Sequence, residues 1–202
     1  MRLYLAFILD EAPFDSTLSN VLVRLARGPF RHVEIVIKCE HEVVRYVVPQ
    51  PTAEHPAADV HYTGRRFSPE VTWRFLELLY SRERVRQIYQ SLDAAILRGD
   101  YFSYKAMYRS GLPWVPEFLL DKYCPKDPVG TGKPTFCGKL CVEALQAAGL
   151  LEFVPADMCN ASDVYSLALI HLNAIADLAP FAAVSFVDAA GYAVSAGYAL
   201  SV

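Results

Sequence analysis

Cys137 and His32 are the residues whose types and positions best suit a nucleophilic reaction. Cys137 stands in the stretch PTFCGKLCVEAL, at the start of a predicted helix over 136–148, for which Thr135 is the expected N-cap. Unpaired N–H groups and the helix dipole favour a thiolate at that end, and the same N–H groups suit a developing oxyanion. Helical spacing places Cys137 at the tip of the predicted buried face, so its sulfur should point toward whatever the helix packs on.

Two other roles for Cys137 compete with that of a nucleophile. The simplest is a small buried cysteine that fills space in the core. Alternatively, Cys137 and Cys141 lie four residues apart on one helical face and could bind a metal ion, with a histidine as a further ligand. The close-pair spacing of structural zinc sites is missing, and no second cysteine pair exists. A disulfide between them would distort the helix. We therefore expect no metal and no other cofactor.

His32 is the best placed of the five histidines to act as a base toward a thiol. It opens a predicted strand over 32–39, HVEIVIKC, in which Val33, Ile35 and Ile37 share one face. His32 and Glu34 share the other face, about 6.5–7 Å apart along the strand, so Glu34 can orient the imidazole or raise its pKa. A surface His-x-Glu pair is the alternative. The other histidines fall in turns, loops or a late helix: His41, His55, His61 and His171.

The strand of His32 needs neighbours that hold it in place. Residues 3–9 predict a buried strand, and 42–48 predict an antiparallel partner that follows a turn at 40–41. That turn pairs His32 with about position 49, so Gln50 is a second candidate for the third catalytic group. The segment 52–66 is expected to be a loop with one short edge strand.

Capping residues and periodicity predict the helices. We expect them at 15–27, at 69–80 from the Ser-Pro-Glu start at 68–70, at 83–98 before Gly99, and from 162 to about 176. These helices with the strands predict an α+β fold with an antiparallel sheet. The stretch 100–134 is expected to be irregular. Its aromatic residues, Tyr101 and Tyr104 among them, are expected either to line a substrate cleft or to pack beneath the sheet.

Composition excludes several classes of partner. The 202 residues are 53% apolar and 20% charged, with a net charge of −3, which supports a sizeable core and leaves no basic field for nucleic acid or an anionic membrane. We predict no signal peptide and, with an odd number of irregularly spaced cysteines, a reducing compartment. The apolar tail 178–202 is expected to form strands or an assembly contact between subunits. Its glycines, serines and Asp188 make a membrane anchor a poor fit.

Two motifs resemble circularly permuted papain-like proteins of the NlpC superfamily. HVEIVI after GPFR is similar to the family's "Ser-His-Val-x-Ile-Val" strand. FCGKLCVEALQAAGLL resembles its nucleophile helix, usually "Cys-Ser-Glu-Leu-Val-x-x-Ala-Leu-x-x-Ala-Gly", with Cys-Gly-Lys in place of Cys-Ser-Glu. GDYFSYKAM and NASDVYSLAL resemble the segments that precede and follow that helix in viral and bacterial members. As in the permuted members, the histidine strand precedes the cysteine helix.

The resemblance implies one permuted papain-like domain over 1–177, followed by the extension 178–202. It implies Cys137 as nucleophile, His32 as general base, and Glu34, or else Gln50, as the orienting group. A cysteine-dependent hydrolase or acyltransferase would act on a peptide, isopeptide or acyl-lipid substrate. A papain-like domain that has lost catalysis and binds or assembles, for instance in a virion, is the alternative. The expected location is cytoplasmic or virion-associated.

Overall fold

The structure is a computed structural model of the chain, and it describes residues 1–9, 28–39, 42–49, 59–64, 66–124, 126–128 and 132–177. Four expectations lie outside these residues: the helix at 15–27, the turn at 40–41, the placement of Gln50 and the form of the tail 178–202. The described residues form a mixed α+β fold built on an antiparallel sheet, as the sequence predicts.

A six-stranded sheet in the order β4-β3-β2-β1-β5-β8 is the centre of the fold, and every pair in it is antiparallel. Its strands are β1 (Arg2–Leu9), β2 (Phe30–Lys38), β3 (Val43–Val47), β4 (His61–Thr63), β5 (Trp73–Leu78) and β8 (Ile175–Asp177). The predicted strands at 3–9, 32–39 and 42–48 are thereby confirmed, and β4 is the short edge strand expected within 52–66. The two-residue strands β6 (Tyr101–Phe102) and β7 (Pro134–Thr135) pair separately, in parallel.

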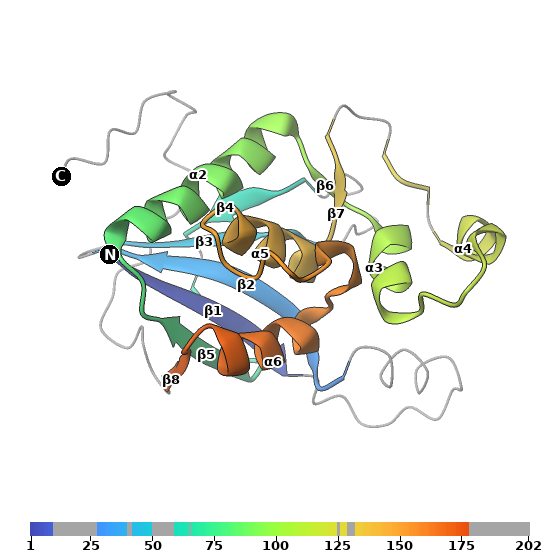
Figure 1. The fold of residues 1–202 in the computed structure, drawn as a ribbon. Helices are drawn as coiled ribbons and strands as arrows, with labels where there is room; N and C mark the ends of the chain where they lie inside the picture. The colour runs from blue at the N-terminus through green and yellow to red at the C-terminus, as the bar shows by residue number, and fades with distance from the viewer. Residues whose placement is uncertain are drawn as a thin grey trace.

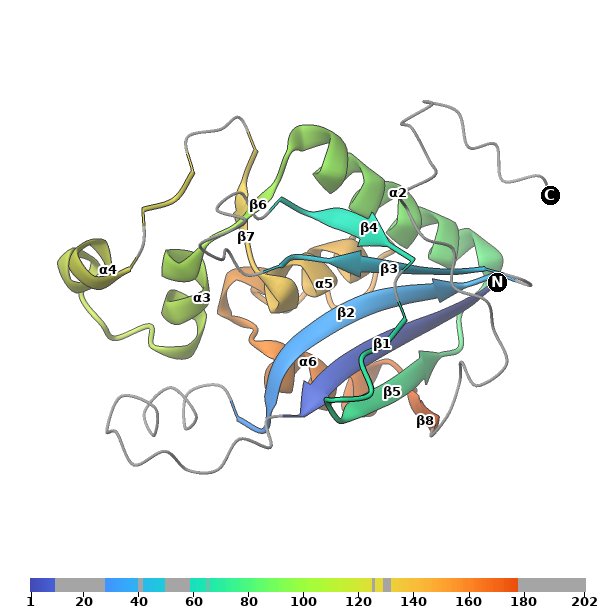
Figure 2. The same ribbon diagram turned by 180° about the vertical axis from the view of Figure 1, so that it is seen from behind.

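Helices cover one face of this sheet. In Figure 1, α2 (Arg82–Arg98), α5 (Cys137–Gln146) and α6 (Ala161–His171) lie in front of the strands, and Figure 2 shows the strands from behind. The short helices α3 (Tyr104–Gly111) and α4 (Glu117–Tyr123) lie beyond one end of the sheet, and the 3-10 turn η1 (Ala156–Met158) links α5 to α6. The helix α5 packs on β2 and on both α2 and α6.

Alternation along the strands sorts side chains between two cores. Val33, Ile35 and Ile37 of β2 point into the large core beneath the helices, together with Leu140 and Ala144 of α5. On the opposite face, Val36 joins a smaller cluster that is covered by aromatic side chains. Its members are Tyr4, Ala6, Val36 and Val43, with Phe67, Trp73 and Phe75 packed against them. The predicted division of β2 into two faces is therefore confirmed.

The prediction of a helix at 69–80 is wrong, because the segment forms a turn and then the strand β5. Ser68 does use its hydroxyl, but it accepts the Glu70 N–H at 3.2 Å within a turn and begins no helix. After this turn Trp73 and Phe75 face the small core while Leu76 and Leu78 face the large one. The alternation of side chains between the two faces of β5 thus outweighs the local signal for a helix start at 68–70.

Other boundaries also differ from expectation. The stretch 100–134 is less irregular than expected, since it contains α3 and α4. The helix predicted to run to about 176 ends at His171, and the chain returns to the sheet edge as β8. The helix expected at 83–98 is confirmed as α2, and Gly99 ends it in a left-handed conformation, with φ of 71°.

Candidate functional site

Cys137 lies in the first turn of its helix, as predicted, but α5 begins at Cys137 rather than at 136 and Thr135 does not cap it. Phe136 is the N-cap residue and provides no side-chain cap, because Thr135 is buried in β7, where its hydroxyl contacts the Phe136 carbonyl at 3.5 Å. The first-turn N–H groups of α5 therefore keep the character of an uncapped helix end. The buried residues Leu140, Cys141, Ala144, Leu145 and Ala148 form the predicted inward face.

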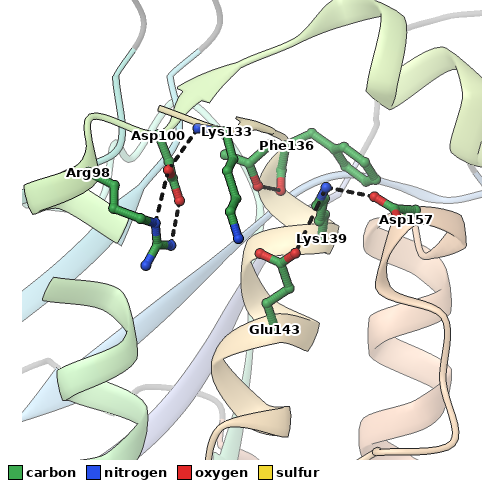
Figure 3. A network of polar contacts seen from close by, with 8 residues as sticks. Arg98, Asp100, Lys133, Phe136, Lys139, Glu143 and Asp157 are labelled. Carbon is green, nitrogen blue, oxygen red and sulfur yellow. Dashed lines mark hydrogen bonds and ion pairs between the residues drawn. The ribbon is translucent and has the colours of Figure 1, made fainter. Parts of the chain in front are cut away.

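Gly138 and Lys139 anchor the first turn of α5 to the loop before α6. A Cβ atom on Gly138 would overlap the carbonyl oxygen of Cys159, so only glycine allows this approach. The Lys139 ammonium lies 2.6 Å from Asp157 in η1 and 3.8 Å from Glu143 one helical turn on. Figure 3 shows Lys139 between these two carboxylates. The Cys-Gly-Lys sequence thus fixes the start of the helix through backbone packing and an ion pair.

A second polar cluster holds the strand that leads into α5. The Asp100 carboxylate, almost fully buried, accepts hydrogen bonds from the Arg98 guanidinium at 2.7 and 3.3 Å and from the Lys133 backbone N–H at 2.9 Å. Figure 3 places these three residues beside the first turn of α5. Because Lys133 directly precedes β7, the cluster fixes the chain a few residues before Cys137.

The structure brings Cys137 and His32 together. The Cys137 sulfur lies close enough to the His32 imidazole, and to the backbone N–H groups of Val33 and Gly138, for all three groups to lower its pKa. The sulfur therefore lies at the junction of β2 and the start of α5. The His32 side chain remains 19% exposed and Cys137 8% exposed, so the pair is mostly withdrawn from water.

Glu34 adjoins the same imidazole. Its Oε1 atom lies 3.3 Å from Nε2 of His32, and its side chain is only 4% exposed. The predicted His-x-Glu pair therefore faces inward and is not a surface pair. Together the three residues form a continuous polar chain, Cys137–His32–Glu34, in which the imidazole lies between a thiol and a carboxylate.

These contacts determine the charges at the site. Burial opposes an imidazolium, but hydrogen bonds and negative charge from Cys137 and Glu34 outweigh it and raise the pKa of His32 to about 10. Burial likewise opposes a thiolate. The hydrogen bond from His32, its positive charge and the two backbone N–H groups nevertheless lower the pKa of Cys137. Both shifts favour a thiolate–imidazolium pair over the neutral pair.

The other cysteines show the opposite tendency. Burial raises the pKa of Cys141 well above its ordinary value and that of Cys159 to about 11. Burial also raises the pKa values of Cys39 and Cys124, which are only partly buried. All five cysteines are described, and all are free thiols. Cys137 alone among them has a lowered pKa.

Arg45 is the member of the site that the sequence analysis missed. Its guanidinium binds both oxygens of Glu34, with Nε 2.7 Å from Oε2 and Nη2 2.9 Å from Oε1. It lies on β3, opposite Val36. A lone arginine in the apolar strand segment EVVRYVV was the available signal, because a charge on an inward face usually has a partner.

A cleft of about 640 Å³ lies near the start of α5 without opening onto the sulfur. Residues of α3, β7, α5 and η1 line it, including Lys105, Arg109, Pro134, Lys139 and Asp157. Lys139 is two residues after Cys137, about 200° round the helix, which explains why the sulfur is absent from the lining.

The expected cleft residues Tyr101 and Tyr104 are not part of that lining. Tyr101 is buried in β6, and the Tyr104 ring contacts Phe102 edge-on at 4.9 Å and stacks with Tyr108 at 6.5 Å. Their neighbours Ser103, Lys105 and Ala106 line the cleft instead. The two tyrosines are thus placed in packing positions beside it.

Searches among protein-family models, curated proteins and solved structures give no significant match to the chain. The described residues contain no cluster of three or more His, Cys, Asp or Glu side chains suited to a metal ion. Within that same part of the chain, no helix combines the length and apolar character that crossing a membrane requires.

Proposed function

We propose that the chain is a cysteine-dependent hydrolase or acyltransferase that acts on an amide, isopeptide or ester bond, with the arrangement of a permuted papain-like enzyme. The observation that carries the proposal is the close placement of Cys137, His32 and Glu34 at the start of a helix. A space-filling cysteine would need neither a buried imidazole nor a buried carboxylate behind it. Those groups cost free energy to bury, and nucleophile activation is the use that explains them.

The proposed reaction begins with the thiolate. The Cys137 sulfur attacks the carbonyl carbon and forms a C–S bond, while first-turn N–H groups of α5 stabilise the oxyanion. The tetrahedral intermediate collapses, the bond to the leaving nitrogen or oxygen breaks, and the His32 imidazolium donates its proton to the leaving group. Water, or another acceptor, then attacks the thioester, His32 takes its proton, and the C–S bond breaks. Glu34 holds the imidazole and stabilises its charged form.

The alternative function is a binding or assembly role without catalysis. The observation that favours it is the separation of the cleft from Cys137, whose side chain has little exposure. In that case the polar chain would be a retained structural element. The substrate would have to reach the sulfur over the edge of β2 for the enzymatic proposal to hold.

Selective alkylation distinguishes the two. The full chain is treated with iodoacetamide at pH 6 and the labelled sites are mapped by mass spectrometry. Under the enzymatic proposal Cys137 is modified first, ahead of Cys39 and Cys124, although these are less buried. His32→Ala should abolish that preference. His61→Ala is the matched control, since His61 is exposed and its Nδ1 atom lies 3.0 Å from the Asp59 carbonyl oxygen.

A turnover assay completes the test. With p-nitrophenyl acetate as the probe, the wild-type chain should release p-nitrophenol in a burst equal to the number of active sites, and Cys137→Ala should not. Slow and uniform labelling of all five thiols, together with no burst, would reject the enzymatic proposal and favour the binding role.

A further inference from the structure

The pairing of Glu34 with Arg45 is more specific than charge neutralisation requires. Both carboxylate oxygens are bound, at 2.7 and 2.9 Å, and Oε1 accepts from Arg45 on one side while facing His32 on the other. A two-point guanidinium–carboxylate pair fixes the plane of the carboxylate as well as its charge. The rotation of Glu34, and so the direction of its contact with the imidazole, depends on Arg45.

Arg45 is itself held by groups in β5 and in the segment just before it. Its Nη1 donates to the Arg66 carbonyl at 3.1 Å, and its Cζ atom lies 4.2 Å from the centre of the Phe67 ring and 5.3 Å from that of Trp73. These rings pack edge to face, 4.7 Å apart. The guanidinium is thus held between a backbone carbonyl and aromatic faces, which favours a cation in a nearly water-free position.

We propose that Arg45 is a positioning residue for the reaction. By binding Glu34 at two points under the cover of Phe67 and Trp73, it holds the carboxylate ionised and aimed at His32, and through His32 it sustains the thiolate of Cys137. This inference rests on the proposed function and extends the site across the sheet, from α5 to the face opposite the helices.

Titratable groups from three elements face this chain of contacts. Glu34 is faced by His32 from its own strand, by Arg45 from β3, and by the Cys141 thiol of α5, which stays protonated. His32 is faced by Cys137 and Glu34. Without Arg45, the buried Glu34 carboxylate would lose a cation and two hydrogen bonds and take up a proton in acid. A protonated Glu34 stabilises the imidazolium less, so less thiolate remains.

The test measures the rate of Cys137 alkylation by iodoacetamide from pH 4.5 to 9, with the fold of each variant checked by near-UV circular dichroism. Arg45→Met keeps the length of the side chain and removes its charge, and Arg45→Lys keeps the charge without the two-point geometry. The control is Arg98→Met, because Arg98 also binds a buried carboxylate, that of Asp100, at two points. If Arg45 had only a structural role, Arg45→Met and Arg98→Met should both lose stability, and neither should change the pH profile of Cys137 alkylation.

We expect Arg45→Met to lower the alkylation rate at pH 5.5 about tenfold, the loss expected for one charge-assisted hydrogen bond. Its profile should move to higher pH, and Arg45→Lys should move in the same direction by less. Arg98→Met should keep the pH dependence of the wild type, even if a loosened approach to α5 lowers the rate equally at every pH. A folded Arg45→Met with the wild-type profile overturns the inference and leaves the proposed function standing. If Arg45→Met does not fold, a wild-type profile for Arg45→Lys overturns it. Wild-type Cys137 that is unreactive in acid rejects both proposals.

Discussion

The carbonyl oxygen of Cys159 occupies the space that a side chain on Gly138 would need. This contact joins the loop before α6 to the first turn of α5, one residue from the proposed nucleophile. It also explains why glycine stands at this position. The start of α5 is positioned by backbone packing on this side and by the sulfur's hydrogen bonds on the other.

Gly138→Ala should therefore displace the loop at 159–160 and disturb Cys137. Overpacking at such a contact costs about 1–3 kcal/mol, and we expect a loss in this range in the free energy of unfolding by urea. The selective labelling of Cys137 at pH 6 should fall as well. The control is Gly99→Ala, where no atom lies within 4 Å of the added Cβ and only the positive φ of 71° is strained. It should lower stability without changing the labelling, and equal effects of the two variants on labelling would contradict this reading.

The coupling between thiolate and imidazolium predicts a pKa change that can be measured on the histidine. In the wild type the pKa of His32 is raised to about 10, with burial opposing the effect and Cys137 and Glu34 producing it. Cys137→Ala removes one of the two groups that raise it while the burial remains. The pKa of His32, followed by NMR of the imidazole protons, should fall well below 10. A value that stays near 10 in the variant would show that the sulfur does not stabilise the imidazolium.

Glu34 should make the free energy of unfolding depend on pH in the acid range. Burial favours its protonated form, but hydrogen bonds and charge from His32 and Arg45 prevail and lower its pKa below the ordinary 4.5. A lowered carboxyl pKa contributes stability above the unfolded value, and this is lost as the pH falls through the folded value. The free energy of unfolding of the wild type should therefore decline below about pH 4.5.

Glu34→Gln tests this directly. The variant leaves the Arg45 cation buried without its anion, and we expect a loss of about 3 kcal/mol at pH 7. Its stability should also depend less on pH below 4.5 than that of the wild type. Urea unfolding at pH 7, 5 and 4 measures both quantities. Parallel wild-type and variant curves across this range would mean that Glu34 is not the responsible group.

Periodicity predicted the elements that carry the site. The alternation in β2 correctly separated His32 and Glu34 from Val33 and Ile35, and the helical spacing after Cys137 gave the buried face of α5. These patterns are readable because each element has one face in a core. Their assembly, with the sulfur beside the imidazole, depends on tertiary packing that no local pattern in the sequence specifies.

Other features depend on contacts between distant segments. Arg45 could be recognised as unusual in an apolar strand, but its cover of Phe67 and Trp73 depends on a turn and strand that the sequence analysis read as a helix. Ser68-Pro69-Glu70 suits a turn as well as a helix start, so tertiary context decides. The Thr135 cap was wrong for a similar reason, because pairing with β6 buries that residue.

The hydrogen bonds of Asp100 allow a test of how far the start of α5 depends on the polar cluster that precedes it. Its carboxylate accepts from Arg98 and from the Lys133 N–H, and its backbone carbonyl accepts the Val60 N–H at 2.7 Å. Asp100→Ala leaves the Lys133 N–H without this acceptor in a partly buried place, which should cost about 1–3 kcal/mol in the free energy of unfolding. Amide hydrogen exchange should accelerate at Lys133 and at Thr135 of β7 more than in β1.

The matched control for Asp100 is Glu83→Ala in the first turn of α2. Glu83 also pairs with an arginine, Arg86, at 3.4 Å, but both side chains are exposed. An exposed pair of this kind contributes little, so this variant should change stability by less than about 0.5 kcal/mol and leave exchange in β7 unchanged. If Asp100→Ala altered stability without faster exchange at Lys133, the cluster would stabilise the end of α2 and not the approach to Cys137.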